Sequence, residues 1–170
     1  MFTRLLALLY LLSLAQPSQA QQLKTLQAPD TCRVTTPAEQ PFVPPAPYRA
    51  KPSEGSFWFG TDRLWTSLPS SGSWSGLPPY TPDDTTFRQK MIFGRQGYDP
   101  MAEPQPKLRL TGKRLDGLAP LLLSDEASNG WTRRDQPFMV TGINFPTIGC
   151  WKITAHYKTE DLTFVLWIAK

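Results

Sequence analysis

Two runs near the carboxyl terminus decide the fold: residues 150–157 read CWKITAHY and residues 162–168 read LTFVLWI. Every second residue is apolar in both runs, from Trp151 to Tyr157 and from Leu162 to Ile168. Four polar residues, 158–161, connect the two runs. Strict alternation is typical of a strand with one buried face, and two such runs joined by a short polar connection predict a β-hairpin.

The rest of the chain offers further short strands and no pattern of helical period. Its 18 prolines also oppose long helices. A single hairpin cannot bury its own apolar face, so the earlier strands must form an opposing layer. The sequence therefore predicts an all-β sandwich or barrel of about seven or eight short strands. The strand-like segments are 56–60, 63–69, 85–93, 107–111 and 138–145, and the expected loops include 70–84, 94–106 and 125–136.

The amino terminus has the three parts of a secretory signal peptide. Arg4 supplies a positive start, residues 5–14 form an apolar run, and Ser18-Gln19-Ala20 supplies small residues at a cleavage site. The run is shorter than the ~20 residues of a membrane span. We therefore expect a leader at 1–20 that is cleaved after Ala20, no membrane span, and a secreted, periplasmic or envelope location.

Two cysteines, Cys32 and Cys150, remain after the leader. Export permits a disulfide, and two thiols allow only one intramolecular pairing. The alternative is two unpaired cysteines, one in the amino-terminal tail and one buried. We favour the disulfide because the expected compartment is oxidising and because the number of cysteines is even.

Residues 21–52 are rich in proline, which favours extended backbone. We interpret them as an arm of polyproline II character that lies over a domain at 53–170 or leads into it.

Composition excludes several classes of function. Residues 21–170 carry 17 basic and 14 acidic side chains in mixed order, a net charge of +3, which gives no electrostatic case for nucleic-acid binding. The one histidine, His156, leaves no zinc ligand set and no obvious hydrolytic triad. Phosphate-loop and dinucleotide fingerprints are absent from the sequence. We expect no cofactor, no metal site and no catalytic residues.

Aromatic side chains are the one excess: the chain has 6 Trp, 5 Tyr and 9 Phe. Those in predicted strands are interpreted mostly as core. Those in predicted loops either stack on sugars or anchor a partner, or else they cover the ends of the sandwich. The candidate binding residues are Trp74, Tyr80, Tyr98 and Trp131.

Residues 143–154, INFPTIGCWKIT, are similar to the penultimate-strand region of bacterial immunoglobulin-like domains. Residues 57–65 and 110–117, FWFGTDRLW and LTGKRLDG, resemble uncharacterised secreted bacterial proteins that contain such a domain. The resemblance implies an immunoglobulin-like sandwich and a secreted location, and it implies no activity. The chain departs from antibody-type domains because Cys32 lies in the arm, where a bond to Cys150 pins the arm to the hairpin, and because the tyrosine corner is missing.

These observations favour a secreted, non-enzymatic binding or structural domain of the bacterial envelope, with a protein or glycan partner. One alternative is a carbohydrate-binding module that uses the loop aromatics. A second alternative is a secreted hydrolase whose acid pair comes from Asp62, Asp83, Asp84, Asp99 and Asp116.

Overall fold

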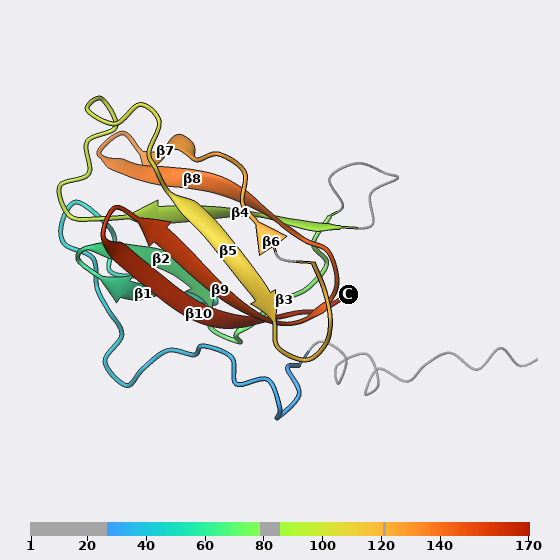
Figure 1. Cartoon of the computed structure of the whole chain (residues 1–170). Helices are drawn as coiled ribbons and strands as arrows, with labels where there is room; N and C mark the ends of the chain where they lie inside the picture. Colours follow the sequence, from blue (N-terminus) through green and yellow to red (C-terminus); the bar gives the residue numbers. More distant parts are fainter. Residues whose placement is uncertain (1–26, 79–85, 121) are drawn as a thin grey trace, which may run out of the picture.

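The computed structural model describes residues 27–78, 86–120 and 122–170, and within these ranges the chain forms strands and no helix (Figure 1). The strands are β1 (Ser56–Thr61), β2 (Leu64–Pro69), β3 (Ser73–Trp74), β4 (Phe87–Gly94), β5 (Arg109–Arg114), β6 (Leu122–Leu123), β7 (Ser128–Arg133), β8 (Gln136–Phe145), β9 (Gly149–Tyr157) and β10 (Glu160–Ile168). No described residue belongs to a helix that can cross a membrane. The all-β expectation is confirmed. The expected leader and its cleavage site lie outside the described residues.

The strands form two five-stranded sheets that pack face to face. Sheet A has the order β1-β2-β4-β8-β7, and sheet B has the order β3-β10-β9-β5-β6. The run β2-β4-β8-β7 facing β10-β9-β5 reproduces the strand order ABED against GFC of immunoglobulin-like sandwiches. The chain adds β1 as a hairpin partner of β2, and β3 as a short strand parallel to the end of β10.

The predicted carboxyl-terminal hairpin is present as β9 and β10. Its turn contains only Lys158 and Thr159, because Glu160 and Asp161 already pair with Tyr157 and His156. Lys158 adopts φ 56°, the left-handed conformation that two-residue hairpin turns require. The two acidic residues at the start of β10 thus gave a longer predicted connection than the hairpin has.

The main core lies between the two sheets. The inward residues of β9 and β10 are fully enclosed: Trp151 and Leu166 are 0% exposed, and Phe164 is 1% exposed. Each buried side chain of this size contributes ~1.5–3 kcal/mol of hydrophobic stabilisation. The alternation of the two runs therefore reports their burial correctly.

Two predicted loops contain strands. Residues 125–136 include β7, an edge strand that pairs only with β8. Most of its side chains are exposed, so its sequence carries no apolar alternation. Residues 70–84 include β3, whose two residues are too short for any periodic signal. These two strands, together with β6, account for the ten strands observed in place of seven or eight, since β1 corresponds to the predicted segment 56–60.

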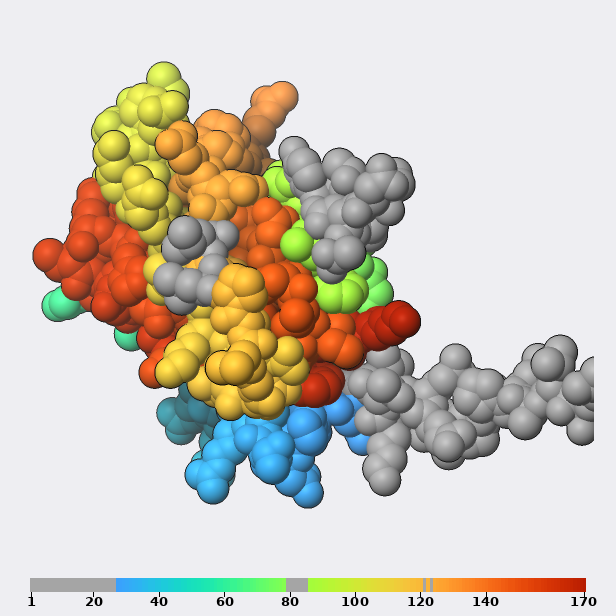
Figure 2. Space-filling view, turned by 45° about the vertical axis from the view of Figure 1, so that its right-hand side comes forward, coloured from blue at the N-terminus to red at the C-terminus, as the bar shows by residue number. Residues whose placement is uncertain are grey.

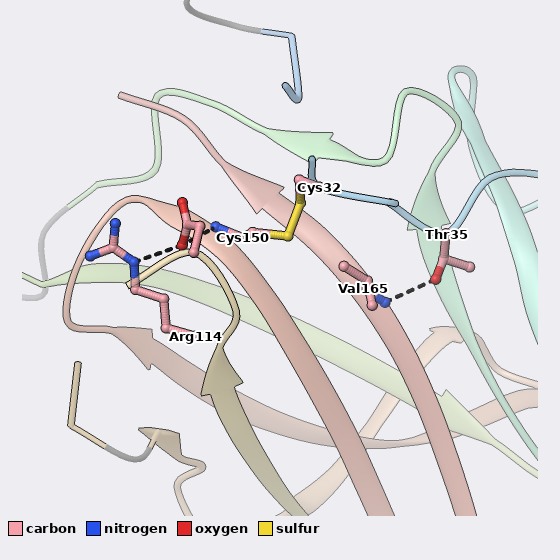
Figure 3. The surroundings of a disulfide bond; sticks show 6 residues. Cys32, Thr35, Arg114, Cys150 and Val165 are labelled. Atoms are coloured by element: carbon pink, nitrogen blue, oxygen red, sulfur yellow. Dashed lines mark hydrogen bonds and ion pairs between the residues drawn. A yellow bond between two sulfur atoms is a disulfide. The ribbon is translucent and has the colours of Figure 1, made fainter. Parts of the chain in front are cut away.

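The proline-rich arm wraps the sandwich from one sheet to the other. Cys32 is bonded to Cys150 on the outward face of β9, as expected (Figure 3). Thr35 then exchanges two hydrogen bonds with Val165 at the edge of β10, at 2.8 and 2.9 Å. Val34 packs against Gly72, where an added Cβ would lie 2.4 Å from a valine methyl group. The arm thus covers part of an otherwise unpaired strand edge, which is one way in which proteins prevent edge-to-edge aggregation.

Candidate functional site

A second apolar cluster lies on the outer face of sheet A. Trp58, Trp65, Phe138 and Val140 point outward from their strands and are nonetheless buried, with Trp65 at 0% exposed. The arm supplies the cover through Phe42 and Tyr48. The Tyr48 ring lies edge-on to Trp65 at 5.2 Å and to Phe138 at 5.0 Å between ring centroids. The arm is therefore a third layer over sheet A.

Hydrogen bonds hold this part of the arm in one position. The Tyr48 hydroxyl donates to the Pro137 carbonyl at 2.6 Å, and the Trp58 indole N–H donates to the Arg49 carbonyl at 2.9 Å. The buried Gln136 side chain donates to the Pro47 carbonyl at 2.7 Å. Burial raises the pKa of the Tyr48 hydroxyl above 10, so it remains a donor at neutral pH. The arm is consequently a fixed wall that can shape a binding site.

Two adjoining hollows lie between this wall and the body of the domain. The larger, of 570 Å³, is mostly apolar; its lining includes Pro41, Phe42, Val43, Phe57 and Trp58. The smaller, of 270 Å³, is lined mostly by polar residues and is called the polar hollow below. It is lined by Arg49, Pro52, Ser53, Trp58, Ser67, Ile92, Thr132, Arg133 and Gln136. Pro52, Ser53 and Trp58 line both hollows. We take this pair of hollows as the candidate site.

The structure does not bring together the three predicted aromatic residues that it describes. Trp74 lies on β3, half-buried, with its ring 6.1 Å from Phe145, so it closes one end of the core. Tyr98 is 7% exposed, and its hydroxyl donates to the Asn129 side chain. Trp131 lies on β7 and is 54% exposed. Tyr80 lies outside the described residues.

Trp74 and Trp131 lie at opposite ends of the sandwich. Trp74 contacts Phe145 at the end of β8, whereas Trp131 pairs with Pro137 near its beginning. Eight residues of strand separate the two positions by about 26 Å. Trp74 and Tyr98 thus help to cover the core, which is the second of the two roles expected of the loop aromatics. Of the three described candidates, only Trp131 remains open to a ligand.

A charged cluster occupies the end of the sandwich where the β4–β5 loop meets the β9–β10 turn. The Glu103 carboxylate accepts hydrogen bonds from Tyr157 and Lys158 and lies 3.6 Å from Arg95. Burial favours a higher pKa for Glu103, but these hydrogen bonds and charges outweigh it and lower the pKa below 4.5. Burial and the bond to Glu103 in turn raise the pKa of Tyr157. Figure 2 shows this loop, in yellow-green, and the beginning of the arm, in blue, on opposite sides of the molecule.

This end also contains a cleft of 410 Å³ whose lining includes Asp62 and Glu160. Glu160 is paired with Arg63 at 3.3 Å. Asp99 accepts a backbone hydrogen bond from Met101, and Asp116 is held by Arg114 and by the Cys150 amide. Glu160, Asp99 and Asp116 are thus engaged in local structure, and Asp83 and Asp84 lie outside the described residues.

His156 lies on the outer face of sheet B between Asp161 and Thr111. Its Nδ1 is 2.7 Å from Asp161 Oδ1, and its Nε2 is 3.2 Å from Thr111 Oγ1. The order Asp-His-Thr resembles a hydrolytic triad, but the His and Asp side chains are 44% and 65% exposed. A triad requires a buried aspartate and an oxyanion-binding pocket, so the arrangement is a cross-strand polar row. Among the described residues, no group of three or more His, Cys, Asp or Glu side chains is placed to hold a metal ion.

Sequence reasoning missed the residues of the hollows. Arg49 and Arg133 have no motif, and the arm that positions Arg49 meets β7 only in the folded chain. The strands did carry a sequence signal that the outer face of sheet A is covered, because Trp58, Trp65 and Phe138 are large apolar residues at positions that face away from the main core. Searches with the chain matched no protein-family model, no curated protein and no solved structure.

Proposed function

We propose that this protein is a non-enzymatic domain outside the cytoplasm that binds a component of the cell envelope in the hollows beneath its arm. The observation that carries the proposal is the pair of adjoining hollows of 570 and 270 Å³, which lie between a fixed arm and sheet A. Concave sites with an apolar wall and a few convergent polar groups are typical of ligand binding. The disulfide that fastens the arm fits an oxidising compartment.

The hydrolase alternative has less support. A glycosidase acid needs a raised pKa to donate a proton at neutral pH. Glu103 and Asp116 both have a lowered pKa: although burial favours a higher one, the hydrogen bonds from Lys158 and Tyr157 to Glu103 and from Arg114 to Asp116 outweigh it. Alanine substitution of Asp62, Asp99 and Asp116 that abolishes a hydrolytic activity would restore this alternative.

The proposal is tested by filling the hollows. Ser53 is exposed and lines both of them, so Ser53→Trp places a large side chain in the site without disturbing the core. Ser75→Trp is the matched control, since Ser75 is also exposed and is not among the lining residues. Wild-type protein and the control should retain the same component from solubilised envelopes of the host. Ser53→Trp should lose that component while unfolding at an unchanged temperature.

Retention of the same component by Ser53→Trp would contradict the proposal. In that case the exposed Trp131 becomes the next candidate, because among the described candidate aromatics it alone is left open for stacking on a sugar.

A further inference from the structure

We propose that the polar hollow binds a carboxylate-bearing sugar unit, such as a uronic acid, through its acid group. This inference rests on the proposed function and names the class of ligand. Arg49 and Arg133 line the hollow, and its lining contains no carboxylate. None of the ion pairs of the described residues includes either arginine. The hollow therefore offers two guanidinium groups that no described carboxylate pairs with.

Guanidinium groups are suited to a carboxylate because their planar donors match its two oxygens. Arg49 reaches the hollow from the arm, and Arg133 reaches it from the end of β7 beside a β-bulge. Bulges commonly redirect a side chain towards a functional site. The two cations thus come from separate elements and converge on one space.

The remaining lining favours a sugar over a peptide carboxylate. Ser53, Ser67 and Thr132 supply hydroxyl groups that can pair with the hydroxyls of a sugar ring. Trp58 and Ile92 form an apolar part of the wall. The Gln136 amide is already engaged, since it donates to the Pro47 carbonyl and accepts from Thr132 at 3.0 Å, so it fixes the wall of the site.

The size of the hollow limits the ligand to one ring. Its 270 Å³ is slightly below the ~300–1,000 Å³ of typical small-molecule sites. The apolar hollow begins at the shared residues Pro52, Ser53 and Trp58 and offers space for the group attached to that ring. We therefore expect the acid unit to be recognised at the end or within a branch of a larger glycan.

The test is an amide-shift titration of the isotope-labelled protein with glucuronate, glucose and free glutamate. Glucuronate should shift the amides of Arg133 and Gln136 with saturable binding, and glucose and glutamate should each bind at least tenfold more weakly. Raising the salt concentration should weaken the binding of glucuronate, because surface arginines are screened.

Variants separate this site from the general surface charge. Arg133→Gln and Arg49→Gln should each weaken glucuronate binding about tenfold, because a charge-assisted hydrogen bond is lost. Arg134→Gln is the matched control: Arg134 is the exposed neighbour of Arg133 and is not among the lining residues, so its change should alter affinity less than about twofold.

Several outcomes would overturn the inference: no shift with glucuronate, equal binding of glucose or glutamate, or equal losses for Arg133→Gln and Arg134→Gln. These failures are distinguishable from failure of the proposed function. If Ser53→Trp abolishes envelope binding while glucuronate does not bind, the function stands and the ligand class is wrong. If glucuronate binds and Ser53→Trp leaves envelope retention intact, the polar hollow binds an acid sugar, but the proposed envelope-binding function of the hollows is wrong.

Discussion

Replacement of Cys32 and Cys150 by alanine should destabilise the protein by about 5 kcal/mol, because it opens the loop that the disulfide closes. The two cysteines lie 118 residues apart. In the chain-entropy model, a cross-link across this separation removes about 16 cal/mol/K from the unfolded chain, or about 5 kcal/mol at 25 °C. Alanine is the better substitute because both cysteines are at most 4% exposed, and a serine hydroxyl would be buried without its partner.

Urea denaturation followed by tryptophan fluorescence measures the effect. With a slope of about 2 kcal/mol per molar urea, the midpoint should fall by roughly 2.5 M. The slope itself should rise, because the unfolded chain without the cross-link is less compact. Wild-type protein denatured in the presence of a reductant is the control and should unfold like the Cys32→Ala, Cys150→Ala variant.

A loss below about 1 kcal/mol with an unchanged slope would refute this reasoning. It would mean that residues around Cys32 separate from β9 before the domain unfolds, so that the bond no longer closes a loop in the cooperative transition. The contact of Thr35 with Val165 argues against such separation, because it fastens the arm a second time at the edge of β10.

Three further predictions concern single side chains. Gly94→Ala should cost about 1–3 kcal/mol and shift the fluorescence of Trp65, because an added Cβ would lie 2.5 Å from the indole ring; unchanged stability would contradict that packing. Glu103→Gln should destabilise the protein by about 1 kcal/mol at pH 7. Burial favours a higher pKa for Glu103, but hydrogen bonds and nearby cations outweigh it and lower the pKa in the fold. The ionised carboxylate therefore stabilises the fold at pH values above 4.5, its ordinary pKa. This stabilisation is lost as the pH falls through the lowered pKa. Wild type and variant should therefore converge in urea denaturation as the pH falls from 4.5 through the lowered pKa, and a difference that persists at acid pH would oppose this assignment. Trp131→Ala should change the unfolding free energy by less than about 0.5 kcal/mol, whereas Trp74→Ala should cost about 2–3 kcal/mol; equal losses in urea denaturation would mean that the exposed ring is also structural.

The hairpin and the sandwich were predictable from sequence because burial on one face imposes a period of two. Residues 150–157 and 162–168 show this period without interruption, and they form β9 and β10. Edge strands lack it. In β7 most side chains face solvent, so its residues follow no period, although the backbone is fully part of sheet A. The strand order, too, follows from packing of distant segments and has no local signal.

The disulfide was predictable from the expected export and from the even number of cysteines, but its structural consequence was only partly so. A bond between the arm and the hairpin was expected to pin the arm, and it does so at the outward face of β9. That the arm continues around the edge of β10 and across sheet A depends on contacts of Thr35 and Tyr48. Neither residue belongs to a motif, and prolines indicate extended backbone without indicating its path.

The burial pattern of sheet A nonetheless contains the reason why an arm is needed. In a two-layer sandwich the residues that face outward are polar. In β2, Leu64, Trp65 and Thr66 are consecutive and all buried, so both faces of this strand are covered. The main core covers one face, and a third layer must cover the other. The arm supplies it with Phe42 and Tyr48, and the two hollows lie beside this cover, where arm residues and Trp58 line both of them. The binding site we propose thus adjoins the apolar face that the arm covers.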